Sequence, residues 1–155
     1  MTPNVVRCLL IPISGGQLLL PNSVVAEVFP YNEPERVAEN QPNWLLGLID
    51  WRNQRIPLLS IEEALSLPVA TSAKKYRTVI LYGLESTAVM PYYALRAAEV
   101  PRSVAVKEED LTEPSSEKRT GLVFSVVYNT ETVWLPDFSY LENLLKKSQV
   151  FSRLT

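Results

Sequence analysis

The 155-residue chain contains no histidine, one cysteine (Cys8) and only five glycines. The lack of histidine excludes Ser-His-Asp and Cys-His nucleophile systems, histidine-ligated zinc and phosphotransfer through a histidine. A single cysteine can form neither an intramolecular disulfide nor a cysteine cluster, which is typical of a reducing compartment. No Gly-x-Gly-x-x-Gly or Walker-type loop is present to hold a nucleotide. We therefore expect no catalytic residue, no metal site and no cofactor, and hence a protein that is not an enzyme.

Net charge and hydropathy exclude further classes of protein. Fifteen basic and 17 acidic residues give a formal net charge of −2, so the chain has no bulk attraction for nucleic acid or an anionic membrane. Its apolar runs are a few residues long, far short of the roughly 20 needed to cross a bilayer, and the N-terminus does not resemble a signal peptide. We expect a cytoplasmic protein without membrane insertion or nucleic-acid binding. A small β-barrel binding single-stranded nucleic acid stays as an alternative on one basic cluster, residues 74–77.

Short apolar runs rich in Val, Ile, Leu and aromatic residues are separated by many of the 12 prolines. This pattern indicates an all-β protein with short strands, frequent turns and few short helices. The expected strands cover residues 5–14, 17–21, 24–30, 45–51, 54–59, 76–82, 86–90, 95–101, 121–128 and 132–135. Residues 70–75 and the charged run 107–120 are expected to be loops.

Two helices are predicted from their capping residues. Ser60 and Glu63 form a capping box that begins a short helix ending near Leu67. Asp137 is a good N-cap for a second helix over residues 138–147, which ends in two lysines that the helix dipole favours.

A weak internal repeat suggests how the strands are organised. Residues 18–30 have a loose counterpart in residues 88–101, and each half ends in a strand that runs into a capped helix. Taken as a true repeat, it predicts two five-stranded β-barrels that share a hydrophobic interface. The expected subdomains are residues 15–85 and residues 86–136 plus the N-terminal strand, within a single domain 1–155. Chance similarity between two β-rich halves remains the alternative.

Residues 47–58 are the most informative stretch, because they predict a strand, a tight polar turn and a second strand. Gly47 permits close approach of another backbone segment, and Arg52 offers five donors beside an aromatic and an acidic residue. On residue types alone the hairpin can be purely structural. Arg52 then pairs with Asp50, and Trp51 fills the core.

This stretch resembles the CheW family, the adaptors of bacterial chemosensory arrays, which carry a glycine, an Arg-Gly turn and an apolar strand with proline. Asn53 stands where the family usually has glycine, and Asn tolerates positive φ better than most residues. A second family feature, a Val-x-Glu-Ile type strand end, is similar to residues 25–28. The second half departs from the family, with Met90-Pro91 in place of Val-Asp. As a whole, the sequence resembles the PilI-type and ChpC-type members of the family, from type IV pilus systems, more than flagellar CheW. The matching residues are Gly47, Arg52, Ile56, Pro57 and Leu58.

The resemblance implies an SH3-like, CheW-like fold and a non-enzymatic adaptor. Such an adaptor couples a methyl-accepting chemoreceptor to the regulatory domain of a CheA-like histidine kinase, in chemotaxis or twitching motility. By motif match, Val25, Glu27 and Arg52 would face the receptor, and Ile49 and Leu58 are assigned to the neighbourhood of the kinase-facing surface. From the residues alone, Val25 can equally be a plain core residue and Glu27 a solvated strand residue. A binding module for another protein is the alternative function.

Overall fold

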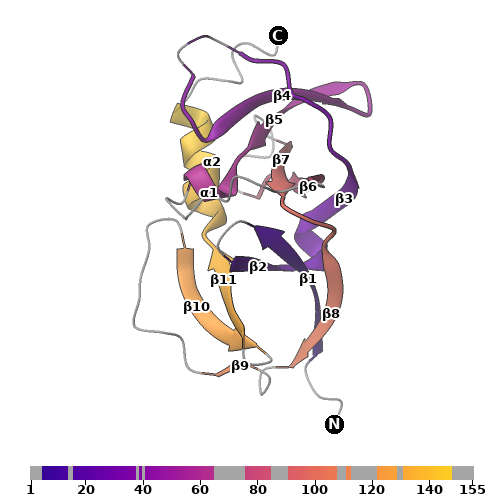
Figure 1. Ribbon diagram of the computed structural model, residues 1–155, viewed down its shortest axis with the longest axis vertical. Helices are drawn as coiled ribbons and strands as arrows, with labels where there is room; N and C mark the ends of the chain where they lie inside the picture. Colours follow the sequence, from indigo (N-terminus) through magenta and orange to yellow (C-terminus); the bar gives the residue numbers. More distant parts are fainter. Residues whose placement is uncertain are drawn as a thin grey trace.

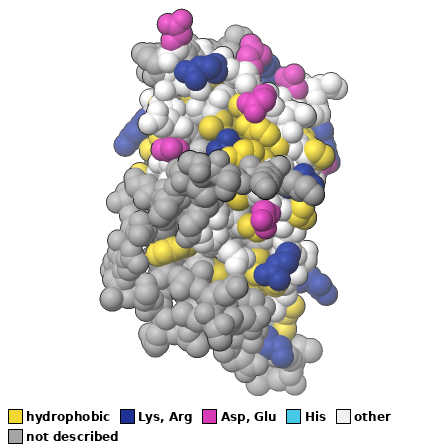
Figure 2. All heavy atoms as spheres, in the orientation of Figure 1, with side chains coloured by type: hydrophobic (Ala, Val, Ile, Leu, Met, Phe, Trp, Pro, Cys, Tyr) yellow, Lys and Arg dark blue, Asp and Glu magenta, His cyan; other side chains and the backbone are white. Residues whose placement is uncertain are grey.

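The computed structural model describes residues 5–13, 16–37, 39, 41–64, 76–84, 91–107, 111–112, 122–128 and 131–147. Within them the chain is mostly β, as the short alternating runs predict. One sheet has six strands in the order β8-β1-β2-β11-β10-β9, and the other has five in the order β3-β6-β7-β5-β4. Figure 1 shows the two sheets one above the other along the longest axis, with the five-stranded sheet uppermost. In the same orientation, Figure 2 shows most of the acidic side chains of this face over the five-stranded sheet.

The strands are short and are divided between the two sheets. The six-stranded sheet contains β1 (Val5–Ile13), β2 (Gly16–Pro21), β8 (Arg102–Lys107), β9 (Leu111–Thr112), β10 (Leu122–Tyr128) and β11 (Glu131–Pro136). The five-stranded sheet contains β3 (Val25–Pro30), β4 (Leu45–Trp51), β5 (Gln54–Leu59), β6 (Arg77–Tyr82) and β7 (Tyr92–Ala97). The helices are the 3-10 helix η1 (Asn22–Val24), α1 (Ile61–Ala64) and α2 (Phe138–Lys147).

Sheet membership differs from the expected halves of the chain at two strands. β2 pairs with β1 in antiparallel register, because only a two-residue connection separates them and a hairpin is the shortest closure. β7 pairs with both β6 and β5. The five-stranded sheet therefore uses the continuous stretch from β3 to β7, and the six-stranded sheet takes strands from both ends of the chain.

The strand expected over residues 95–101 is wrong, because β7 ends at Ala97 and a new strand begins at Arg102. The Ala98 amide donates instead to the Pro12 carbonyl at 2.8 Å, and Pro101 has no N–H for a ladder. β8 was missed because its exposed positions weaken the apolar signal, and β9 lies in the segment expected to be a loop. The expected strand 86–90 and the loop 70–75 lie outside the described residues.

Both helices have the predicted N-cap residue, but the capping box is only half formed, because the Ser60 amide donates to the Trp44 carbonyl at 2.8 Å rather than to Glu63. The Glu63 amide donates to Ser60 Oγ at 3.3 Å, and the Tyr140 amide donates to Asp137 Oδ1 at 3.2 Å. The second helix has the expected bounds of 138–147, and it rises from the end of β11 beside the five-stranded sheet (Figure 1). No helix in the described part of the chain is long and apolar enough to span a membrane.

The largest hydrophobic cluster joins the two sheets, as the two-subdomain hypothesis requires. It combines side chains from β1 and β2, from four strands of the five-stranded sheet, and from α2 through Leu141 and Leu145. Trp134 belongs to this cluster and Trp44 packs against it. Each sheet also has a smaller cluster of its own. The two sheets therefore share one hydrophobic core rather than having only separate ones.

Candidate functional site

The β4–β5 hairpin has a two-residue turn, flanked by the opposed pair Trp51 and Gln54. Both turn residues have positive φ, +47° at Arg52 and +62° at Asn53. Two positive values define a type I′ turn, whose twist matches the twist of the flanking strands. Asn53 adopts this conformation readily, which confirms that the turn survives without the glycine. Arg52 adopts it at a cost of about 1–2 kcal/mol.

Glu27 on β3 binds this hairpin with both carboxylate oxygens. Trp51 Nε1 donates to Glu27 Oε2 at 3.1 Å, and Arg52 Nη2 donates to Glu27 Oε1 at 3.3 Å. The Arg52 guanidinium also lies 4.6 Å from the centre of the Trp51 ring, within the range of a cation–π interaction. Two of the residues matched to the receptor-facing surface, Glu27 and Arg52, are therefore in direct contact.

The alternative pairing of Arg52 with Asp50 is wrong. Asp50 lies directly opposite Arg55 in the β4–β5 register, and Arg55 Nε is 3.5 Å from Asp50 Oδ1. Cross-strand neighbours on one face of a sheet are the natural partners of a strand residue. The same structural interpretation of the hairpin placed Trp51 in the core, and this part is confirmed, since the Trp51 side chain is buried.

An aromatic row continues from the hairpin across the end of the sheet. Tyr92 packs edge-on against Trp51 with ring centroids 4.7 Å apart, and Tyr82 follows at 5.6 Å from Tyr92. Tyr82 is 42% exposed, and Val28 on β3 is also exposed. Sequence reasoning missed Tyr82, because its position opposite Tyr92 depends on the β6–β7 register. Tyr93, by contrast, is completely buried.

We call Glu27, Trp51, Arg52, Tyr82 and Tyr92 the bridged aromatic surface. Arg52 and Glu27 keep 63% and 39% of their side chains exposed despite their contact. Aromatic and arginine side chains are the residues that protein interfaces favour. An interface formed here would cost little side-chain freedom, since the polar groups of Glu27, Trp51 and Arg52 already bind one another.

The other matched residues lie deeper. Val25 is half-buried and packs against the cluster that joins the sheets. Ile49 is nearly buried but lines a surface pocket. Leu58 is fully buried, so its side chain can support a neighbouring surface but cannot itself contact a partner.

Gly47 is explained by a close backbone approach. The Glu35 amide donates to the Leu48 carbonyl at 2.9 Å, and the Leu48 amide donates back to the Glu35 carbonyl at 2.8 Å. A Cβ atom at Gly47 would lie 2.3 Å from the Glu35 carbonyl oxygen. The expectation that this glycine permits close approach is confirmed.

Chemically reactive groups are few in the described part of the chain. No group of three or more acidic or cysteine side chains there is arranged to hold a metal ion. Burial raises the pKa of the Cys8 thiol above its ordinary value, which disfavours the nucleophilic thiolate. The bridged aromatic surface itself consists of one carboxylate, one guanidinium and aromatic rings.

The chain is thus a small β protein with two sheets around a shared core and a hairpin held by Glu27. Comparison with family models matches residues 7–141 to the CheW-like domain, and the chain belongs to that family. Among solved structures it is similar to the scaffolding protein TtCheW from Thermoanaerobacter tengcongensis, with a TM-score of 0.72 at 14% identity. The match covers 88% of this chain and 86% of that one, and at this identity it shows the fold. The comparison with curated proteins gives no match.

Proposed function

We propose that this chain is a non-enzymatic cytoplasmic adaptor that couples a methyl-accepting chemoreceptor to the regulatory domain of a CheA-like histidine kinase. Its membership of the CheW-like family supports this role. The single observation that carries the proposal is the Glu27 bridge to Trp51 and Arg52. It supports the proposal because it joins two of the three residues matched to the receptor-facing surface, Glu27 and Arg52, which both stay partly exposed, whereas Val25 packs against the core.

The bridge gives the surface a physical reason to be rigid. Glu27 belongs to β3 and its two donors to the β4–β5 hairpin, so the carboxylate ties two segments that are not neighbours in the sheet order. Charge-assisted hydrogen bonds of this kind are stronger than neutral ones. A receptor would meet a fixed guanidinium, a fixed carboxylate and the aromatic row beside them.

An adaptor can pass on a signal only by binding the two states of its partners with different affinity. In this proposal the bridged aromatic surface binds the receptor, and the neighbourhood of Ile49 binds the kinase. Leu58 supports the second surface from inside the sheet. The chain acts as one CheW-like domain over residues 1–155, in a chemotaxis or twitching-motility pathway.

The receptor contact is tested by calorimetric titration with a cytoplasmic receptor tip from the same cell. Arg52→Ala should weaken binding about tenfold, because it removes a charge-assisted contact worth about 1.4 kcal/mol. Arg102→Ala is the matched control, since Arg102 is an exposed arginine on β8 of the other sheet. Equal effects of the two variants, or no binding by the unaltered chain, would contradict the receptor assignment.

The kinase contact is tested with the isolated regulatory domain. Ile49→Ala should weaken binding, whereas Ile56→Ala should not, although both side chains belong to the same cluster inside the five-stranded sheet. Of these two isoleucines, Ile49 lines the surface pocket. If both variants weaken binding to the same degree, the effect comes from lost packing and the kinase assignment fails.

A further inference from the structure

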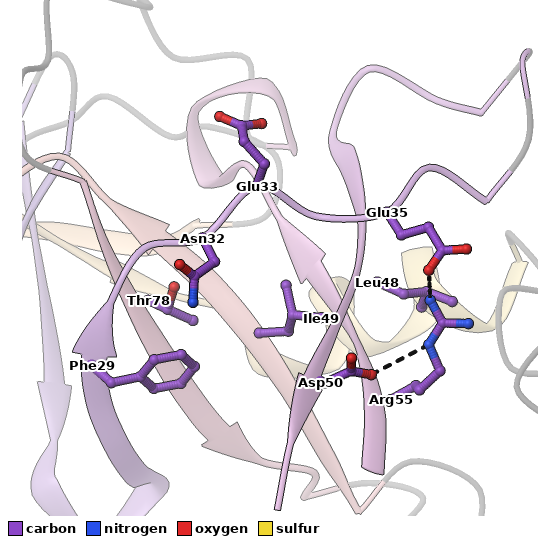
Figure 3. A pocket seen from close by; sticks show the side chains of 9 residues that line it. All are labelled: Phe29, Asn32, Glu33, Glu35, Leu48, Ile49, Asp50, Arg55 and Thr78. Atoms are coloured by element: carbon purple, nitrogen blue, oxygen red, sulfur yellow. Dashed lines mark hydrogen bonds and ion pairs between the residues drawn. The ribbon is translucent and has the colours of Figure 1, made fainter. Parts of the chain in front are cut away.

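A surface pocket of about 270 Å³ lies where the two edge strands of the five-stranded sheet, β3 and β4, face each other. Figure 3 shows the connection between these strands running along one rim, with Asn32 pointing toward Thr78 and the Glu33 carboxylate on the outer side of the rim. Phe29 on β3 and Ile49 on β4 line the pocket below that rim. The volume is below that of sites for drug-sized ligands, about 300–1,000 Å³, so a single side chain is a better fit.

The pocket is acidic. Glu33, Glu35 and Asp50 contribute three carboxylates, against the single guanidinium of Arg55. Arg55 is shared between two of them, because it pairs with Glu35 and also with Asp50 (Figure 3). Among the residues that the structure describes, Glu33 forms no ion pair. The pocket therefore keeps an excess of negative charge, and Arg55 already shows that its carboxylates bind a guanidinium.

A buried hydroxyl in the same pocket lacks a hydrogen bond. Thr78 on β6 lines the pocket and is 1% exposed, and its Oγ1 has no hydrogen-bond partner among the described residues. Buried polar groups without partners are uncommon, because each has lost its water without replacement. The Thr78 hydroxyl can accept a hydrogen bond, so a donor entering the pocket would satisfy it.

We propose that this pocket binds the side chain of an arginine or lysine from a partner protein. The negative charge of the rim would attract the cationic head, which would donate to Thr78 Oγ1, and the methylene stem would lie against Phe29 and Ile49. Such side chains have this combination of a charged head and an apolar stem. A guanidinium suits the site best, because its five donors can serve several acceptors at once. The proposal does not depend on the adaptor function.

The test is an NMR titration of the full chain, with N-acetyl-arginine methylamide as the probe. N-acetyl-citrulline methylamide has nearly the same shape without the charge and is the control ligand. In about 0.15 M salt, where screening acts beyond about 8 Å, the arginine probe should give saturable shifts at the amides of Asn32, Glu33 and Glu35, of residues 48–50 and of Thr78. The lysine analogue should bind at the same amides. Equal binding of the citrulline control, or shifts that spread over the surface without saturation, would overturn the proposal.

Variants then separate the pocket from general acidity. Glu33→Gln and Thr78→Val should each weaken the arginine probe about two- to fivefold. Glu99→Gln removes one exposed negative charge outside the pocket and should leave the affinity unchanged. Unshifted amides elsewhere confirm that each variant is folded. Equal weakening by Glu99→Gln, or unchanged binding by Thr78→Val, would refute the site as described.

Discussion

Gly47→Ala should be strongly destabilising, because the new methyl group would meet backbone rather than a flexible side chain. The Cβ atom would lie 2.3 Å from the Glu35 carbonyl oxygen and 2.9 Å from its carbon, at a φ of +145°. The connection between β3 and β4 would have to move away. That movement would break the two hydrogen bonds between Glu35 and Leu48.

The size of the effect follows from these contacts. A non-glycine residue in such a backbone region costs of order 1–3 kcal/mol, and each lost hydrogen bond costs about 0.5–1.5 kcal/mol net. We expect the free energy of unfolding to fall by about 2–6 kcal/mol. That is a large part of the 5–15 kcal/mol that typically separates folded and unfolded states. Urea denaturation followed by tryptophan fluorescence measures the loss.

Gly16→Ala is the matched control. Gly16 also has a positive φ, +156°, but its Cβ would lie 3.3 Å from the Trp134 side chain, a tight contact that a small shift of the indole can relieve. The difference between the two variants isolates the backbone clash from the conformational cost. If Gly47→Ala loses no more stability than Gly16→Ala, close approach to Glu35 is not the reason for the glycine.

Three further predictions concern stability. Leu58→Ala should lower the free energy of unfolding by about 2–5 kcal/mol in urea denaturation, because the side chain is fully buried; a loss below about 1 kcal/mol would place it at the surface. Asn53→Gly should change stability by less than about 1 kcal/mol, whereas Asn53→Val should cost about 1–2 kcal/mol at a φ of +62°; equal stabilities would argue against the left-handed turn. Burial first, and the Glu142 charge second, raise the pKa of Tyr93 above its ordinary 10.0, so the unfolded chain releases this proton first and stability should fall as pH rises above 10.0. Tyr93→Phe should reduce this fall in alkaline urea titrations; a pH profile identical to that of the unaltered chain would contradict the argument.

Local chemistry explains what was predictable. The Ser60 and Asp137 caps, the β4–β5 turn and the bounds of α2 depend on residues within a few positions of each other. Caps, turns and helix bounds can be predicted from the sequence because they depend on such short-range interactions. Family resemblance added Glu27 and Arg52 as candidates without giving their contact.

Side-chain contacts across the fold were not predictable in the same way. Glu27 and Arg52 are 25 positions apart, and the choice of Glu27 over Asp50 depends on how β3 faces the hairpin. Strand pairing and register likewise decide three other features. These are the sheets to which β2 and β7 belong, the burial of Leu58 and the position of Tyr82.

By itself, then, the sequence determined the β class, the turn chemistry and the helix caps, because propensity and capping act over a few residues. The tertiary structure decided which charges meet, which apolar residues stay at the surface, and where the acidic pocket opens. These features arise when segments far apart in the chain pack together. A hydrophobic pattern specifies that a face is buried, but it does not specify the partner against which that face packs.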